Sequence, residues 1–480
     1  MERAMTCAGL LVLGSVTLVN AGTFRHAASE DSDGTTHADI LRMKTQSRQA
    51  SSYAGFLEDT YMWDMATLEA RKRVFEDTNV NSKDKDDIDN AVKEAKRLGE
   101  KFLERCPFSI MLKEDGFDGQ DKSLHQYVSY STYWWPCNFN PCGSTRAEAR
   151  EYIATSYEAQ QMDLALENLS AAEFAEKINK NSTLNNAYVP DKKVFYNLHH
   201  AIKNAAIAYY FSGDEELSDS AVKAFREFFI NEDTKMNPKL GLSRSQAVLG
   251  YVDSRIMGIM DFRLIVEILD ALAVLNMKGA LTESDREGLY TWLQDYKTWL
   301  ETEGYWEGAI NKINNHAPMA LMQMMGIAMH LGEKDQARSY YNDLAKDMID
   351  SQMESDGALP DELSRTRPTH YVAYCLAAFA HMAHLGAESG SSMDIWGLDE
   401  KRSIELGLEW ALPYATTDLT FPYDEITVVT EWTGDYGLED AAWLLAYHKY
   451  SDEWKDRALD INPKFKESYK WLVFPDRSAE

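Results

Sequence analysis

The sequence predicts an all-α protein built from repeated helical hairpins, as an α/α toroid or solenoid rather than a bundle. Apolar residues recur at steps of three and four along most of the chain. Alternation typical of strands is scarce, and Ile426–Val429 is its best candidate. Helix ends marked by glycine recur about 53 residues apart, a spacing that indicates repeated helix pairs.

One helical domain is expected over residues 52–475, because no Pro/Gly-rich linker divides that stretch. Apolar residues at helical spacing predict helices over Val194–Tyr209 and Phe262–Leu272. Within the first of these helices, His199 and His200 are neighbours, so we expect one to face the core and the other the solvent.

Residues with recognised roles at helix ends support this pattern. A glycine just after an apolar segment supplies the left-handed conformation that ends a helix. Ser or Thr followed three residues later by an acidic residue predicts a capping box at a helix start. The expected terminal glycines are Gly279, Gly332 and Gly386, and the expected capping boxes are Ser170 with Glu173 and Thr282 with Asp285.

The N-terminus is typical of a cleaved secretory signal. Arg3 precedes an apolar run from Leu10 to Val19, and small residues follow up to Ala21. The run is too short to span a bilayer comfortably. We therefore expect a signal peptide over residues 1–21, a disordered polar lead-in over residues 22–51, and a secreted protein that does not associate with membranes.

The net charge of -28 argues against nucleic acid as a partner, because phosphate binding needs clustered Lys and Arg. An acidic protein binds a polyanion only where one site is locally positive. Any anionic partner must therefore be held by a local group of basic residues.

The chain has five cysteines, of which Cys7 lies in the expected signal. Cys137 and Cys142 flank a short Pro-containing loop, and we expect them to form a disulfide in a secreted protein. Cys375 lies on an apolar helix face and is expected to be a buried thiol. No zinc-type spacing is present, so we expect neither metal nor cofactor. The glycosylation sequons are Asn168 and Asn181.

Three segments carry residues suited to chemistry. The first is Asn314-Asn315-His316, before an apolar helix. It is either a helix start with a capping Asn or, because free N–H groups and the helix dipole attract anions, a carboxylate site. The two interpretations are compatible.

The second segment runs from Asp356 to Tyr371 and contains Arg365, Arg367 and His370. A basic cluster in so acidic a chain is where an anion is expected to bind. The alternative is an ion-paired loop in which Glu362 holds Arg365. The third segment places Tyr133, Trp134 and Trp135 before a proline, where at least one ring should be exposed as a binding surface.

These segments, in order, resemble the alginate-lyase superfamily of polysaccharide lyases, nearest in pattern to family thirty-eight and more distantly to family five. The resemblance implies an α/α toroid, an incomplete barrel of helical hairpins with a long substrate cleft. The segments that carry it are His125–Pro136, Asp233–Pro238, Gln246–Asp261, Asn315-His316 and Asp356–Tyr371.

The resemblance also implies roles in β-elimination from a uronate. Tyr371 is the expected catalytic acid and also the base, His316 the second acid or base, and Asn315 and Arg365 contact the substrate carboxylate. The residues expected to bind substrate are His125, Tyr133, Trp134, Trp135, Gln246, Arg255, Arg367 and His370.

The expected activity is cleavage of β-1,4-linked polyuronate, namely alginate with a preference for mannuronate, by a monomer without a cofactor. Three alternatives remain open. A glucuronan lyase would share the mechanism. A glycoside hydrolase on a similar toroid would need two carboxylates flanking the bond. Asp361 and Glu362 are adjacent and cannot flank it together, although Asp261 or Glu307 could join one of them. A non-catalytic carbohydrate-binding protein would bind without turnover.

Overall fold

The computed structural model describes residues 55–79, 82–112, 123–127, 129, 191–240, 258–302, 305–365, 367–397, 402–416, 419–424 and 441–476. The chain divides into the units Met1–Ser52 and Tyr53–Glu480, and the described residues all belong to the second. Every regular element in these residues is helical, which confirms the all-α prediction. None of these helices is both long and apolar enough to cross a membrane.

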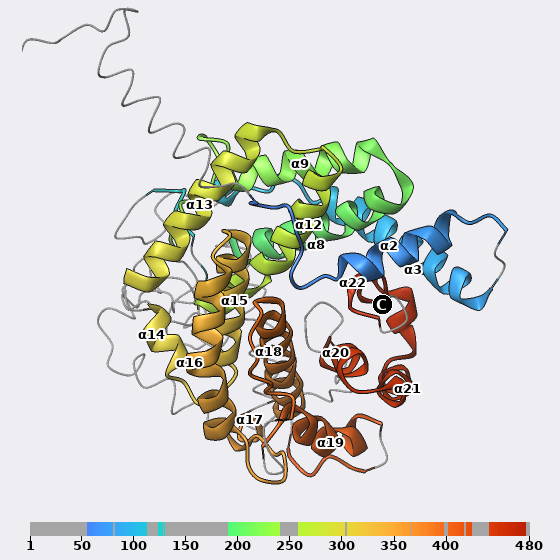
Figure 1. The fold of residues 1–480 in the computed structure, drawn as a ribbon. Helices are drawn as coiled ribbons and strands as arrows, with labels where there is room; N and C mark the ends of the chain where they lie inside the picture. Colours follow the sequence, from blue (N-terminus) through green and yellow to red (C-terminus); the bar gives the residue numbers. More distant parts are fainter. Residues whose placement is uncertain are drawn as a thin grey trace, which may run out of the picture. The chain divides into compact units, whose positions relative to one another are not determined.

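A row of five helices forms the centre of this unit. Each central helix packs on the central helix that follows it in sequence (Figure 1). They are apolar on almost every side, and every residue of α15 is buried, as expected of helices enclosed by others. The central helices are α8 (Asp191–Ser212), α12 (Ile265–Met277), α15 (His316–His330), α18 (Pro368–Glu388) and α20 (Ala441–Lys449).

A second set of helices covers the central row and exposes one polar face to solvent. α9, α16, α19 and α21 each pack on the central helix that precedes them in sequence, so the unit is a series of helical hairpins. This arrangement is the α/α toroid that the sequence predicts. The outer helices are α9 (Glu215–Phe229), α13 (Glu283–Thr302), α16 (Lys334–Gln352), α19 (Ile404–Ala415) and α21 (Asp452–Ile461).

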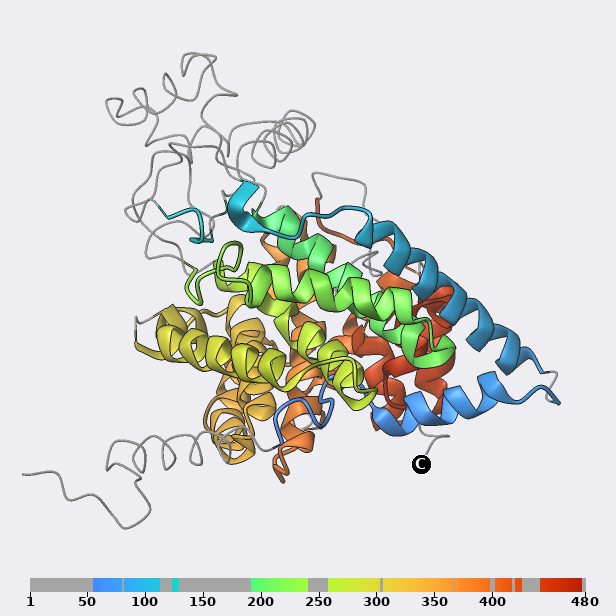
Figure 2. The same cartoon turned by 90° about the horizontal axis from the view of Figure 1, so that it is seen from above.

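The remaining elements are short or lie near the ends of the unit. α3 packs along α8, and Figure 2 shows α2 and α3 beside the C-terminal helices. These elements are α2 (Met65–Glu76), α3 (Lys83–Leu103), η1 (Ile110–Leu112), α11 (Gly258–Asp261), η3 (Phe262–Leu264), α14 (Tyr305–Ile310), α17 (Pro360–Leu363), η4 (Pro463–Glu467) and α22 (Tyr469–Val473).

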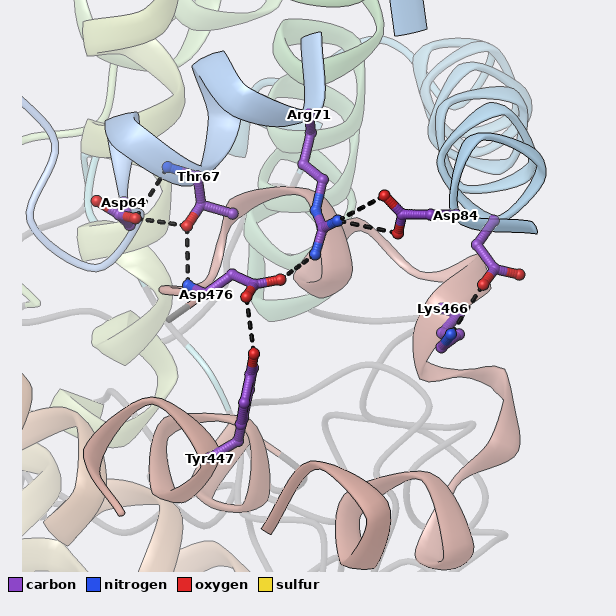
Figure 3. A network of polar contacts seen from close by, with 8 residues as sticks. Asp64, Thr67, Arg71, Asp84, Tyr447, Lys466 and Asp476 are labelled. Atoms are coloured by element: carbon purple, nitrogen blue, oxygen red, sulfur yellow. Dashed lines mark hydrogen bonds and ion pairs between the residues drawn. The ribbon is translucent and has the colours of Figure 1, made fainter. Parts of the chain in front are cut away.

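Polar contacts around Asp476 fasten the C-terminal segment to α2 (Figure 3). Its backbone N–H donates to Thr67 Oγ1 at 2.8 Å, and one carboxylate oxygen accepts the Tyr447 hydroxyl at 2.8 Å. The other oxygen pairs with Arg71, which also reaches Asp84 at 3.1 Å. Because both Arg71 and Asp476 are buried, each needs the other to offset the loss of water.

The directions of α15, α16 and α18 are fixed by contacts at both ends of α16. Near its start, Arg338 Nε donates to the carbonyl of Ser389 at the end of α18, at 2.8 Å. At its end, Gln352 contacts Cys375 in the first half of α18, with 3.6 Å between Oε1 and Sγ. α16 therefore runs antiparallel to α18, and α15 and α18 begin at the same end of the unit.

The predicted helix ends are partly correct. Gly279 and Gly332 adopt positive φ angles of 79° and 80° just after helices, as predicted. The prediction for Gly386 is wrong, because α18 continues through it and Gly390, with a φ of 80°, follows the helix instead. Gly386 is needed for packing, since a Cβ there would lie 2.5 Å from the ring of Tyr341 on α16.

Two further predictions can be compared with the structure. The capping box of α13 is present, because Asp285 N–H donates to Thr282 Oγ1 at 3.2 Å and Thr282 N–H donates to the Asp285 carboxylate at 2.9 Å. The split between the two histidines of α8 is wrong, because both are buried: His199 contacts Glu267 at 2.7 Å and His200 stacks on Phe102. Ser170, Glu173 and the strand candidate Ile426–Val429 lie outside the described residues.

We expect Gly386→Ala to lower the free energy of unfolding by about 1–3 kcal/mol, because the added methyl group would overpack the contact with Tyr341. Urea unfolding followed by circular dichroism measures the change. Gly397→Ala is the matched control, since no heavy atom lies within 4 Å of a Cβ at that position. Equal losses in the two variants would contradict the close-packing role of Gly386.

Candidate active site

Two helix starts meet at one end of the unit. Asn315 occupies the N-cap position of α15 and Tyr371 lies in the first turn of α18, while Glu362 on α17 and then Arg365 precede α18. The first N–H groups of a helix have no partner within it, and they carry the positive end of its dipole. Two such ends close together favour an anion at this place.

The side chain of Asn315 crosses to Glu362 and does not cap its own helix. Its Nδ2 lies 3.0 Å and 2.9 Å from the two carboxylate oxygens of Glu362, and its backbone N–H donates to the same carboxylate. No side-chain capping bond forms at α15. The position was therefore predicted correctly as a helix start, and the asparagine whose amide oxygen accepts a first-turn N–H is Asn314, not Asn315.

The preceding residue, Asn314, fixes the imidazole of His316. The backbone N–H of His316 donates to Asn314 Oδ1 at 3.2 Å, and His316 Nδ1 lies 2.7 Å from the same atom. Because an amide oxygen only accepts hydrogen bonds, Nδ1 carries the proton of the neutral ring. The lone pair is then on Nε2, the nitrogen available to take up a proton.

Burial, together with the positive charges of Arg365 and Lys312, lowers the pKa of His316 to about 4. The imidazole is therefore neutral at pH 7 and can act as a base. The effect of Arg365 also places its charge within electrostatic reach of His316, although the two lie on different segments.

Arg365 lies over the ring of Tyr371, with 3.8 Å between Cζ and the ring centroid. This is a close cation–π contact, and a cation beside a phenol also stabilises its ionised form. The sequence allowed an ion pair between Arg365 and Glu362 instead. In the structure, the guanidinium faces Tyr371 and the carboxylate faces Asn315.

Glu362 is buried, with only 1% of its surface exposed. Burial raises the pKa of this carboxyl group above its ordinary value, while the hydrogen bonds from Asn315 and the charge of Arg365 act in the opposite direction. Glu362 thus connects Asn315 to the segment that carries Arg365. The four residues predicted to be catalytic lie on two adjoining segments at one site.

Some of the residues predicted to bind substrate lie in the described part of the chain, and others lie outside it. His370 is next to Tyr371, with ring centroids 5.2 Å apart, and stacks on Tyr374. Arg367 occupies the N-cap position of α18. The Nδ1 atom of His125 contacts the carbonyl of Lys235 at 2.6 Å, so this nitrogen holds a loop together. Outside the described residues lie Tyr133, Trp134, Trp135, Gln246, Arg255, the expected disulfide Cys137–Cys142, and the sequons Asn168 and Asn181.

Cys375 is a buried, unpaired thiol, as predicted, whereas Cys106 is exposed. In the part of the chain that the structure describes, no three His, Cys, Asp or Glu side chains gather in a way suited to a metal ion.

The structure adds Asn314 and Glu362 to the predicted residues. Two consecutive asparagines before a helix were the sequence signal for the first, because a single cap explains only one of them. Glu362 gave no comparable signal, since its partner lies 47 residues away in sequence.

The site contains a neutral imidazole, a phenol beside a guanidinium, and a buried amide. These groups are suited to proton transfer on an anionic substrate, and they lie in an α/α toroid. The sequence model of the family described as alginate lyase matches residues 113–421. The chain belongs to this family and is a polysaccharide lyase.

One solved structure agrees with the fold. An alginate lyase from Bacteroides ovatus is 21% identical, with a TM-score of 0.68, and the match covers 87% of this chain and 99% of that one. Alginate lyase A1-III from Sphingomonas species A1 is 14% identical, with a TM-score of 0.41, over 60% of this chain and 78% of that one. No curated protein matches the chain.

We expect His316 to titrate at about pH 4 and its pKa to rise in Arg365→Gln, because that change removes one of the positive charges that lower it. The imidazole NMR signal, assigned with His316→Asn, reports both values. Arg457→Gln removes a charge that pairs with Glu409 and Glu453, and should leave the signal unchanged. A midpoint near the ordinary value of 6.5 in the unaltered protein would contradict the buried neutral imidazole.

Proposed function

We propose that this lyase cleaves alginate by β-elimination, with a preference for β-1,4-linked mannuronate. The observation that carries the proposal is the grouping of Asn315, His316, Arg365 and Tyr371 where α15 and α18 begin. We also propose that the protein is secreted, on the strength of the apolar run from Leu10 to Val19.

The reaction requires removal of the C5 proton of a uronate. That proton is only weakly acidic, and the negative charge left behind spreads onto the neighbouring carboxylate. Donors and positive charge placed on the carboxylate stabilise this state, with each preorganised donor contributing roughly 3–4 kcal/mol. Asn315 and Arg365 are the groups suited to this task.

Elimination then breaks the C4–O4 bond, forms a double bond between C4 and C5, and returns a proton to the departing O4. In mannuronate, H5 and O4 lie on the same side of the ring, so Tyr371 serves as both base and acid. An unperturbed tyrosine has a pKa near ~10, and the guanidinium of Arg365 over its ring favours the ionised form.

In guluronate the two groups lie on opposite faces, so a second residue must take the proton. His316 is suited to that role because it is neutral at pH 7 and its Nδ1–H is held by Asn314, which leaves Nε2 as the acceptor. The proposed preference for mannuronate rests on this stereochemistry and on the contact of Arg365 with the Tyr371 ring.

A local positive field reconciles this substrate with a net charge of -28. Arg365 and Lys312 both act on His316, and the positive ends of α15 and α18 lie at the same place. Local charge, not the sum over the chain, determines where a polyanion binds.

We expect the purified protein to raise the ultraviolet absorbance of polymannuronate solutions, because elimination leaves an unsaturated uronate end. The rate should be lower on polyguluronate, which requires a separate base. Glucuronan has the same C4–C5 geometry as mannuronate and is the alternative substrate in the same assay. Cleavage without any rise in absorbance would indicate a hydrolase and contradict elimination.

We expect Tyr371→Phe to lower kcat on polymannuronate by about 10²–10⁴-fold, because it removes the proton-transfer group. Oligomannuronate binding, measured by calorimetry, should persist. The control is Tyr340→Phe, whose hydroxyl bonds Glu301 on the outer helices and which should leave kcat unchanged. A wild-type protein that binds without any turnover would instead indicate a non-catalytic binding protein.

A further inference from the structure

Glu362 is buried at the site, yet β-elimination gives it no direct part. Its carboxylate accepts the backbone N–H of Asn315 and faces Asn315 Nδ2 at 3.0 Å and 2.9 Å. Asn315 is itself 2% exposed. Each residue is thus the principal polar partner of the other in a place that excludes water.

The two nearly equal distances determine how the amide is used. At these distances, the two carboxylate oxygens subtend at Nδ2 an angle much smaller than the angle between the two N–H bonds of the amide. Seen from Nδ2, both oxygens therefore lie in the direction of one N–H, which they share. The second N–H points away from Glu362 and remains to donate elsewhere.

We infer that Glu362 is a positioning residue, which holds Asn315 so that its second N–H is directed at the substrate carboxylate. This inference rests on the proposed function and assigns to Glu362 a role that acts only through Asn315. The backbone bond fixes where Asn315 begins α15, and the side-chain bond fixes the rotation of its amide.

The surroundings of Glu362 determine how strongly it can hold the amide. The groups that act on its charge are Asn315, Arg365, Asp361 and the thiol of Cys375. Arg365 is the positive member of this set, and it lies between Glu362 and Tyr371 in sequence and over the Tyr371 ring. The guanidinium therefore offsets the carboxylate that would otherwise repel an anionic substrate.

Glu362→Gln tests the inference with little change in volume. Gln Oε1 can still accept the backbone N–H of Asn315, but its NH₂ group then faces the NH₂ group of Asn315, so the amide must turn. We expect kcat on polymannuronate to fall about 10-fold or more, with a smaller change in KM. The reason is that the hydrogen bond from Asn315 to the substrate carboxylate strengthens as charge develops in the transition state.

The double variant separates positioning from a structural role. If Glu362 acts through Asn315, then Asn315→Ala combined with Glu362→Gln has the kcat of Asn315→Ala alone, within about 2-fold. Additive losses would overturn the inference. Asp285→Asn is the control, a carboxylate in the capping box of α13 that should change thermal stability without changing kcat or KM.

A measurement on Tyr371→Phe leaves Glu362 unchanged. It therefore tests the inference even if Glu362→Gln fails to fold. With selective ¹⁵N-asparagine labelling, oligomannuronate should shift one of the two side-chain amide protons of Asn315 more than the other. Shifts in neither proton would overturn the inference. A wild type inactive on every uronate would overturn the proposed function, whereas an active wild type with a fully active Glu362→Gln overturns only the role of Glu362.

Discussion

The antiparallel return of α16 between α15 and α18 is the constraint on which the site depends. Arg338 meets Ser389 at one end of the pair, and Gln352 meets Cys375 at the other. Because the outer helix runs back, the two central helices start at the same end. This arrangement brings two helix N-termini to one place, although His316 and Pro368, where the helices begin, are 52 positions apart in sequence. A hairpin repeat thus brings the positive ends of two helices together without requiring a basic protein.

Burial and local charge act together on the ionisation of the site. His316 lies in a strongly acidic chain, which in isolation would favour its protonated form, yet desolvation, Arg365 and Lys312 keep the imidazole neutral. The cation that depresses the pKa of His316 also lies over the ring of Tyr371. One guanidinium therefore acts on both of the groups to which we assign proton transfer.

The helices were predictable from the sequence because their apolar residues follow a local period. Gly279 and Gly332 were correctly predicted for the same reason, since a helix end is local chemistry. Gly386 was not, because its role is set by Tyr341 on another helix. The burial of both His199 and His200 was also missed, since α8 has neighbours on every side. Likewise, Asn315 and His316 stood out locally, whereas the partnership with Glu362 required the fold.

Three buried carboxylates show why Glu362 differs from acidic residues that only stabilise the fold. Asp270 accepts the backbone N–H groups of Tyr61, Met62 and Trp63 and contacts His330. Glu267 is held by His199, Lys203 and Tyr469, and these partners lower its pKa well below the ordinary value. None of these partners is among the residues grouped where α15 and α18 begin. Glu362 alone among these three faces a side-chain amide whose second donor remains available, so its charge controls the direction of a group at the site.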